Sequence, residues 1–235
     1  MTLALYLALP VLALLGGGWL ALTRPPGPIL RSSLQHFAAG VVFAVVAIEL
    51  LPDMVEEHEP WGVILGFSIG VALMLLLRSL TREEEAADAP GSSMGLVVGV
   101  GIDIAIDGLL LGIGFAAGAK VGKLLAVGLT LELLSLGLAT AIELVRNGMT
   151  RTKTVVNLVL MAMLFVATAL AGDLLLHNLK GFWLTVILSF GAAALLYLVT
   201  EELLAEAHED PDTPLASAQF FVGFLALLML SMFGG

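Results

Sequence analysis

The sequence predicts an all-α polytopic membrane protein whose 235 residues form one transmembrane domain. Hydrophobic residues make up 59% of the chain and charged residues 13%, whereas soluble domains carry about 25% charged residues. The mean hydropathy is +1.04. A spanning helix needs about 20 mostly apolar residues, and eight stretches meet that requirement. We expect these helices over residues 2–22, 33–54, 62–80, 94–119, 123–145, 154–176, 182–205 and 215–233.

Polar and proline-rich segments separate the predicted spans. Residues 24–28 (RPPGP) end the first span, because proline cannot continue a helix. The longest polar segment is 81–93 (TREEEAADAPGSS), and residues 209–214 (EDPDTP) end the seventh span. The first span lacks a basic start and a small-residue cleavage site, so we interpret it as a retained helix rather than a signal peptide.

The composition excludes several classes of protein. The chain has 20 acidic and 10 basic residues and a net charge of −10, so it lacks the basic footprint that a nucleic-acid-binding protein needs. It has no cysteine, which excludes disulfides, zinc–thiolate sites and cysteine nucleophiles. Phosphate-loop and hydrolase-elbow motifs are absent. We therefore expect no enzyme activity, and we expect the lipid bilayer as a partner.

Basic residues set the predicted orientation, because loops rich in Lys and Arg stay on the cytoplasmic side. Seven basic residues flank the loops after the first, third and fifth spans, and three flank the loops on the other side. The seven are Arg24, Arg31, Arg78, Arg82, Arg146, Arg151 and Lys153. The three are Lys120, Lys123 and Lys180. This distribution predicts that both termini lie outside, in a multi-pass protein of the plasma (prokaryotic inner) membrane.

Two span endings are alike and predict an internal repeat. Residues 49–53 (ELLPD) end the second span, and residues 201–208 (EELLAEAH) end the seventh. Both endings place acids beside a Leu-Leu step, followed by a further acid and a histidine. The two endings lie on opposite faces of the membrane, as an inverted repeat requires. Inverted repeats are typical of transporters.

Several acids lie inside predicted spans, where a charge costs about 2.5–3.5 kcal/mol even on insertion scales. Asp103 and Asp107 of the fourth span are four residues apart and share one helix face. Glu132 lies in the fifth span and Glu49 in the second. No Lys or Arg lies in the interior of a predicted span, so these acids either are protonated or hold a cation. We predict that all four bind a cation.

Further polar residues surround this predicted site. The gate or relay candidates are Asp53, Ser135, Glu201 and Glu202. The entrance candidates, which would gather cations, are Glu56, Glu57 and His58. The simpler alternative is that the acids near span ends are solvated and that the entrance segment is an ordinary polar loop.

The motif residues resemble the ZIP (Zrt-/Irt-like) metal transporters, most closely the short bacterial branch related to GufA. Residues 103–108 (DIAIDG) resemble the fourth-span motif of that family, and a small-residue run follows at 112–118 (GIGFAAG). Residues 132–139 (ELLSLGLA) resemble the fifth-span motif in two registers, in which Glu132 stands either for its histidine or for its acid. The endings of the second and seventh spans also resemble those of the family.

The resemblance implies a ZIP-like bundle with inverted repeats and a divalent metal ion as the transported substrate, moved by alternating access. It leaves a homodimer open. The chain departs from the family in having no mid-span histidine, and residues 163–166 (MLFV) replace the acid of the sixth span. We therefore expect a single-cation site.

The expected ligands bear on the choice of metal. Imidazole suits zinc, copper, iron and nickel, whereas carboxylates suit magnesium, calcium and manganese. Within the zinc, manganese and iron class, an all-oxygen site therefore favours manganese or another hard ion. Two alternatives stay open: a transporter of protons or another cation, and a non-transporting sensor-like relative. An intramembrane enzyme is disfavoured, because no His or Lys lies at the depth of Ser135 to activate it.

Overall fold

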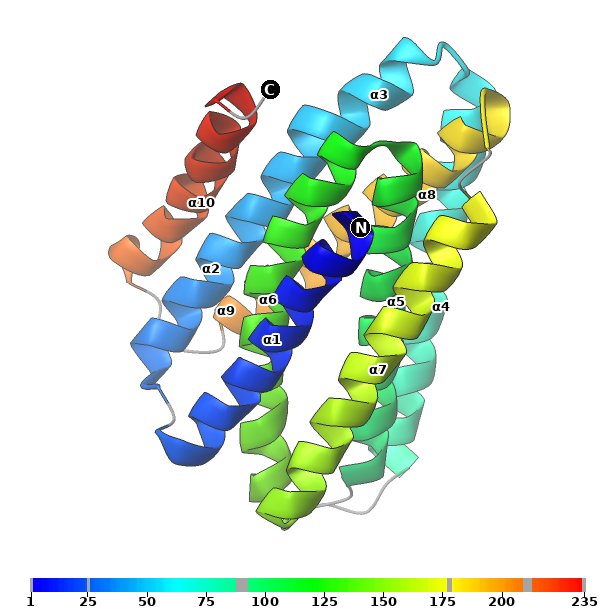
Figure 1. The fold of residues 1–235 in the computed structure, drawn as a ribbon. Helices are drawn as coiled ribbons and strands as arrows, with labels where there is room; N and C mark the ends of the chain where they lie inside the picture. Colours follow the sequence, from blue (N-terminus) through cyan, green and yellow to red (C-terminus); the bar gives the residue numbers. More distant parts are fainter. Residues whose placement is uncertain (1, 25, 88–92, 177–178, 209–212, 234–235) are drawn as a thin grey trace.

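The computed structural model describes residues 2–24, 26–87, 93–176, 179–208 and 213–233. These residues form an all-α bundle with eight helices long and apolar enough to cross a membrane (Figure 1), which confirms the predicted fold class. The elements are α1 (Thr2–Thr23), α2 (Pro28–Val45), η1 (Val46–Leu50), α3 (Leu51–Glu56), α4 (Pro60–Ala87), α5 (Ser93–Ala117), α6 (Ala119–Arg146), α7 (Arg151–Leu176), α8 (Phe182–Tyr197), η2 (Leu198–Leu203), α9 (Leu204–Ala207) and α10 (Pro214–Phe233).

Several observed helices extend beyond the predicted spans. α4 continues to Ala87, so the first half of the predicted polar loop 81–93 is helical. Glutamate and alanine dominate that half, and both are strong helix formers. α2 begins at Pro28, because the fixed φ of proline suits the first turn of a helix. α6 begins at Ala119, ahead of the predicted start at residue 123.

Two spans contain a wider, π-helical turn at corresponding places. The second span runs through α2, η1 and α3, and the seventh runs through α8, η2 and α9. In the second span, Pro52 has no N–H to donate to the carbonyl four residues earlier. The N–H of Leu51 bonds instead to the carbonyl of Val46. Both π-turns carry glutamates predicted from the sequence as site residues, and such turns are frequent at functional sites.

The helix contacts repeat in a pattern that agrees with an inverted repeat. α1 packs along α6 while α7 packs along α5, and α10 packs along α2 while α4 packs along α8. Each helix of the first three spans has a counterpart: α1 corresponds to α7, α2 to α8 and α4 to α10, while α5 corresponds to α6. When every helix is replaced by its counterpart, the same four helix pairs result. The exchanged helices are an odd number of spans apart, so they cross the bundle in opposite directions.

Glycines allow the closest of these helix contacts. A side chain at Gly17 of α1 would overlap the carbonyl of Leu134 in α6, and Gly137 of α6 lies equally close to the backbone of α1. In the related helix pair, Gly108 of α5 lies against the carbonyl of Phe165 in α7. Because small residues let membrane helices approach each other closely, these glycines hold α5 and α6, which carry the predicted site, tightly inside the bundle.

The two ends of the bundle differ in their number of Lys and Arg residues; we call the end richer in them the basic end, and the end that holds the acidic residues 53–59 the acidic end. The basic end carries the connections after α1, α4 and α6, and the acidic end carries the turns after α3 and α5. In Figure 1 the acidic end is uppermost; α1 begins toward it and α10 ends toward it. The basic end corresponds to the side that the distribution of Lys and Arg predicts to be cytoplasmic.

Candidate cation site

Three carboxylates from two neighbouring helices converge in the middle of the bundle. Asp103 and Asp107 lie one turn apart on α5, and Glu132 lies on α6, which packs against α5. The three residues offer ligand oxygens that all lie within 4.8 Å of one another. The structure therefore brings together three of the four predicted cation ligands.

These carboxylates are withdrawn from solvent. Asp107 is 0% exposed and Glu132 is 2% exposed, while Asp103 is partly buried. Neither carboxylate oxygen of Asp107 has a hydrogen-bond partner among the described residues. Burying an unpaired charge is strongly unfavourable, and neighbouring carboxylates repel one another when ionised. Asp107 therefore requires either a bound cation or a proton.

Ser135 and Glu202 complete the polar wall of the site. A small cavity of about 20 Å³ is lined by Asp103, Glu132, Ser135 and Glu202, among other residues. Ser135 lies one turn from Glu132 on α6, and Glu202 of η2 lines the same cavity as Asp103. Two residues predicted as gate or relay groups therefore adjoin the three-acid cluster directly.

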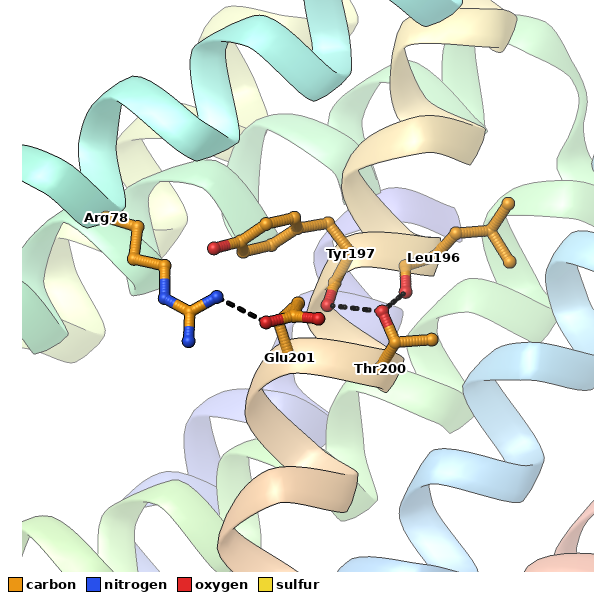
Figure 2. A network of polar contacts seen from close by, with 5 residues as sticks. All are labelled: Arg78, Leu196, Tyr197, Thr200 and Glu201. Carbon is orange, nitrogen blue, oxygen red and sulfur yellow. Dashed lines mark hydrogen bonds and ion pairs between the residues drawn. The ribbon is translucent and has the colours of Figure 1, made fainter.

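A wider cavity of about 320 Å³ connects Asp103 with the basic end of the bundle. Its wall includes Leu96, near the start of α5, together with Arg78 and Tyr197. Arg78 of α4 forms an ion pair with Glu201 of η2 beside the Tyr197 ring (Figure 2). Both charged side chains are more than 40% exposed. Glu201 therefore lines the route to the cluster rather than the cluster itself.

Glu49 lies at the other π-turn and is not part of the three-acid cluster. Its side chain is 7% exposed. The Ser231 hydroxyl of α10 donates a hydrogen bond to Glu49 Oε1 at 2.8 Å. Nζ of Lys120, in the first turn of α6, lies 3.1 Å from the same oxygen. The fourth predicted ligand is thus bound by a hydroxyl and an ammonium group toward the acidic end.

The remaining predicted residues follow Glu49 along the second span. Asp53 is partly buried one turn further on, in α3. Glu56 ends α3, and Glu57 and His58 form the turn before α4, where His58 Nδ1 donates to the carbonyl of Glu56 at 2.5 Å. None of these residues belongs to the three-acid cluster. The structure places the entrance candidates at the acidic end of the bundle.

Sequence reasoning missed the partners of Glu49. Lys120 informs the orientation of the chain, but nothing in the sequence pairs it with Glu49. Ser231 gives no sequence signal, because it is 182 residues from its partner. The sequence shows that Lys120 lies at the start of the fifth span. Its contact with Glu49 depends on how α6 packs beside the second span.

Neither the protein-family models nor the curated proteins compared with this chain match it. The fold and the site define a class: a polytopic helical membrane protein with a buried carboxylate cluster that a cavity connects to one end. The argument for function therefore depends on these residues and their arrangement.

Proposed function

We propose that the protein is a divalent metal cation transporter of the ZIP type, and that Asp103, Asp107 and Glu132 bind the transported ion. One observation carries the proposal: three carboxylates converge, with ligand atoms within 4.8 Å of one another, inside a bundle of eight membrane-length helices. Exposed acidic clusters are common on proteins, but here Asp107 is fully buried. Ionisable residues inside membrane bundles mark substrate and ion pathways.

The oxygen ligands support a hard divalent ion as the substrate. Carboxylates suit manganese better than the imidazole-preferring metals, so we propose manganese ahead of zinc or iron. The cavity of about 20 Å³ beside Glu132 and Ser135 exceeds the roughly 10–15 Å³ that one water needs. A water and the Ser135 hydroxyl are therefore available to complete the coordination of the ion.

We propose that transport proceeds by alternating access, with the basic end facing the cytoplasm of a cell whose plasma membrane holds the protein. In the present conformation the 320 Å³ cavity leads from Asp103 to the basic end. Toward the acidic end, the contacts of Ser231 and Lys120 with Glu49 tie α10, α6 and η1 together. Opening the acidic end breaks these contacts and leaves Glu49 available to an incoming cation. Inverted repeats are the usual basis of such a movement.

Proton exchange follows from the chemistry of the same acids. The Glu202 and Asp103 carboxyl groups line the same small cavity, and neighbouring carboxylates repel each other when both are ionised, which favours a bound proton or cation. Metal binding requires ionised ligands and releases protons. Protons therefore compete with the metal, and metal uptake should fall as the pH is lowered. These neighbouring acids also support a second candidate function, the transport of protons or another cation.

Metal uptake into liposomes tests the proposal. We expect purified wild-type protein to transport Mn²⁺ faster than Zn²⁺, and Asp107→Asn to lose roughly tenfold or more of the initial rate, as loss of a metal-site group commonly does. The matched control is Asp173→Asn, which removes an acid of α7 that lies outside the cluster. This control should transport at the wild-type rate.

Transport of Mn²⁺ by Asp107→Asn at the wild-type rate would contradict the proposed site. Zinc uptake far ahead of manganese would overturn the metal preference alone. Proton flux without metal flux would favour the second candidate function. If the folded wild-type protein moved neither ion, the sensor-like alternative would replace both transport functions.

A further inference from the structure

We propose that a cavity of about 280 Å³ at the basic end binds a phosphate group, supplied either by the headgroup of an anionic lipid or by free phosphate. Residues of α2, α5 and α6 line this cavity. Among the described residues that line it, none belongs to the three-acid cluster. The proposal therefore does not depend on the proposed transport function. The polar lining residues are Arg31 and Gln35 of α2 and Thr140, Glu143 and Arg146 of α6.

Two guanidinium groups make this cavity positive. Arg31 lies near the start of the second span and is only partly exposed, and Arg146 ends α6. Glu143 is the one carboxylate among the described lining residues, and its Oε2 lies 3.1 Å from Nη1 of Arg146. Two positive charges and one negative charge leave an excess of positive charge. Basic pockets between transmembrane helices are known to bind phosphate-bearing headgroups.

The chemistry of the guanidinium group suits a phosphate ligand. Its five N–H donors form a planar fork that matches two oxygens of one phosphate. With five donors, a guanidinium can keep a contact within the protein and still bind an anion. The pair of Arg146 with Glu143 is largely exposed, so water and salt screen it and it holds Arg146 only weakly.

Thr140 gives an independent indication of a ligand. Its side chain is 2% exposed and lines the cavity, and its hydroxyl has no hydrogen-bond partner among the described residues. Other helical threonines instead donate to the carbonyl four residues earlier in the chain: Thr130, Thr168, Thr185 and Thr200. A buried hydroxyl without a partner is unfavourable. A phosphate oxygen in the cavity would accept its hydrogen bond.

The size and position of the cavity suit this ligand. Its volume is more than tenfold the roughly 10–15 Å³ that one water needs, which leaves room for a tetrahedral phosphate and several waters. The cavity shares Leu96, Val100 and Leu136 with the 320 Å³ cavity that leads from Asp103 to the basic end. A bound phosphate would thus place negative charge beside the route of the cation, where it raises the local cation concentration.

Native mass spectrometry of the delipidated full-length protein tests the site with added lipids. We expect the wild type to bind phosphatidylglycerol, which carries a net negative charge, more tightly than the zwitterionic phosphatidylcholine. Arg31→Gln should weaken phosphatidylglycerol binding roughly tenfold, because it removes a charge-assisted hydrogen bond. Thr140→Val keeps the shape of the side chain and should weaken binding several-fold. The matched control is Arg151→Gln, which removes an exposed arginine of α7 at the same end and should bind like the wild type.

Calorimetric titration of the same protein with inorganic phosphate distinguishes the two sources. If inorganic phosphate binds with the same dependence on Arg31 and Thr140, and phosphatidylglycerol shows no preference, then free phosphate is the ligand. Because Thr140→Val changes no charge and little volume, it tests the site even if Arg31→Gln fails to fold.

The proposal would be overturned if the wild type bound neither ligand, or if neither substitution weakened the binding of either ligand. Asp107→Asn separates this site from the carboxylate cluster. That variant should lose Mn²⁺ binding and keep its affinity for phosphate, so a failure of one proposal leaves the other to stand on its own measurement.

Discussion

The second and seventh spans carry related π-turns, but the glutamates of these turns have different surroundings. At η1, Glu49 is buried and bound by Ser231 and Lys120. At η2, Glu202 adjoins Asp103, and the neighbouring Glu201 pairs with Arg78 in a cavity that opens toward the basic end. Two span endings with similar sequences therefore have different partners in the structure.

This difference indicates which contacts hold the present conformation. Removing the partner of a buried carboxylate is costly, because the carboxylate then stays buried without a hydrogen bond or an opposite charge. An exposed ion pair contributes little, because water and salt screen it. We infer that the contacts of Glu49, rather than the Arg78–Glu201 pair, determine how readily the bundle opens toward the acidic end.

The largest expected effect is a difference in access between the two ends. The chain has no cysteine, so single substitutions need no altered background. Val100→Cys lines the 320 Å³ cavity, whereas Val46→Cys replaces a residue of η1 that is 1% exposed. A membrane-impermeant thiol reagent should label Val100→Cys roughly tenfold faster or more, because thiol reactivity follows exposure. Equal labelling rates of the two variants would contradict the prediction that the cavity is more accessible than η1.

A smaller effect is expected when the ammonium group at Glu49 is removed. Lys120→Gln leaves the buried carboxylate with the Ser231 hydroxyl alone, so the conformation that is closed toward the acidic end loses stability. Labelling of Val46→Cys should become several-fold faster in this background. Lys123→Gln is the matched control, since Lys123 lies on the same helix and is exposed, and among the described residues the ion pair of Glu49 is with Lys120. An unchanged labelling rate in Lys120→Gln would show that this contact does not hold the end closed.

The smallest effect is expected at the exposed ion pair. Glu201→Gln breaks the pair with Arg78, whose two side chains are both more than 40% exposed. We expect the initial rate of Mn²⁺ uptake to stay within about twofold of the wild type, because surface ion pairs contribute little. A loss of uptake rate as large as that of Asp107→Asn would show that Glu201 belongs to the binding site rather than to the wall of the cavity.

The features that depend on local spacing could be predicted from the sequence. Eight apolar stretches predicted the helices, and the four-residue spacing of Asp103 and Asp107 placed both on one face of α5. Glu132 was recognisable because it lies at mid-span without a basic neighbour. The likeness of the two span endings also pointed to the repeat that the helix contacts support.

The features that depend on packing could not be predicted. Hydropathy carries no information about which helices touch, so Glu49 was grouped with the cluster although its partners are Ser231 and Lys120. The burial of His36 was likewise hidden, because its neighbour His208, in the turn after α9, is far from it in the sequence. The local sequence of the seventh span does not predict the π-turn at Leu198–Leu203. The second span has Pro52 after its π-turn, whereas the seventh has Ala205 at the corresponding position.

Anomalous X-ray scattering from crystals grown with Mn²⁺ tests the central claim most directly. The predicted result is a manganese peak bounded by the carboxylates of Asp103, Asp107 and Glu132, which disappears in Asp107→Asn and persists in Asp173→Asn. An unchanged peak in Asp107→Asn, or a wild-type crystal with no manganese at the three carboxylates, would contradict the account.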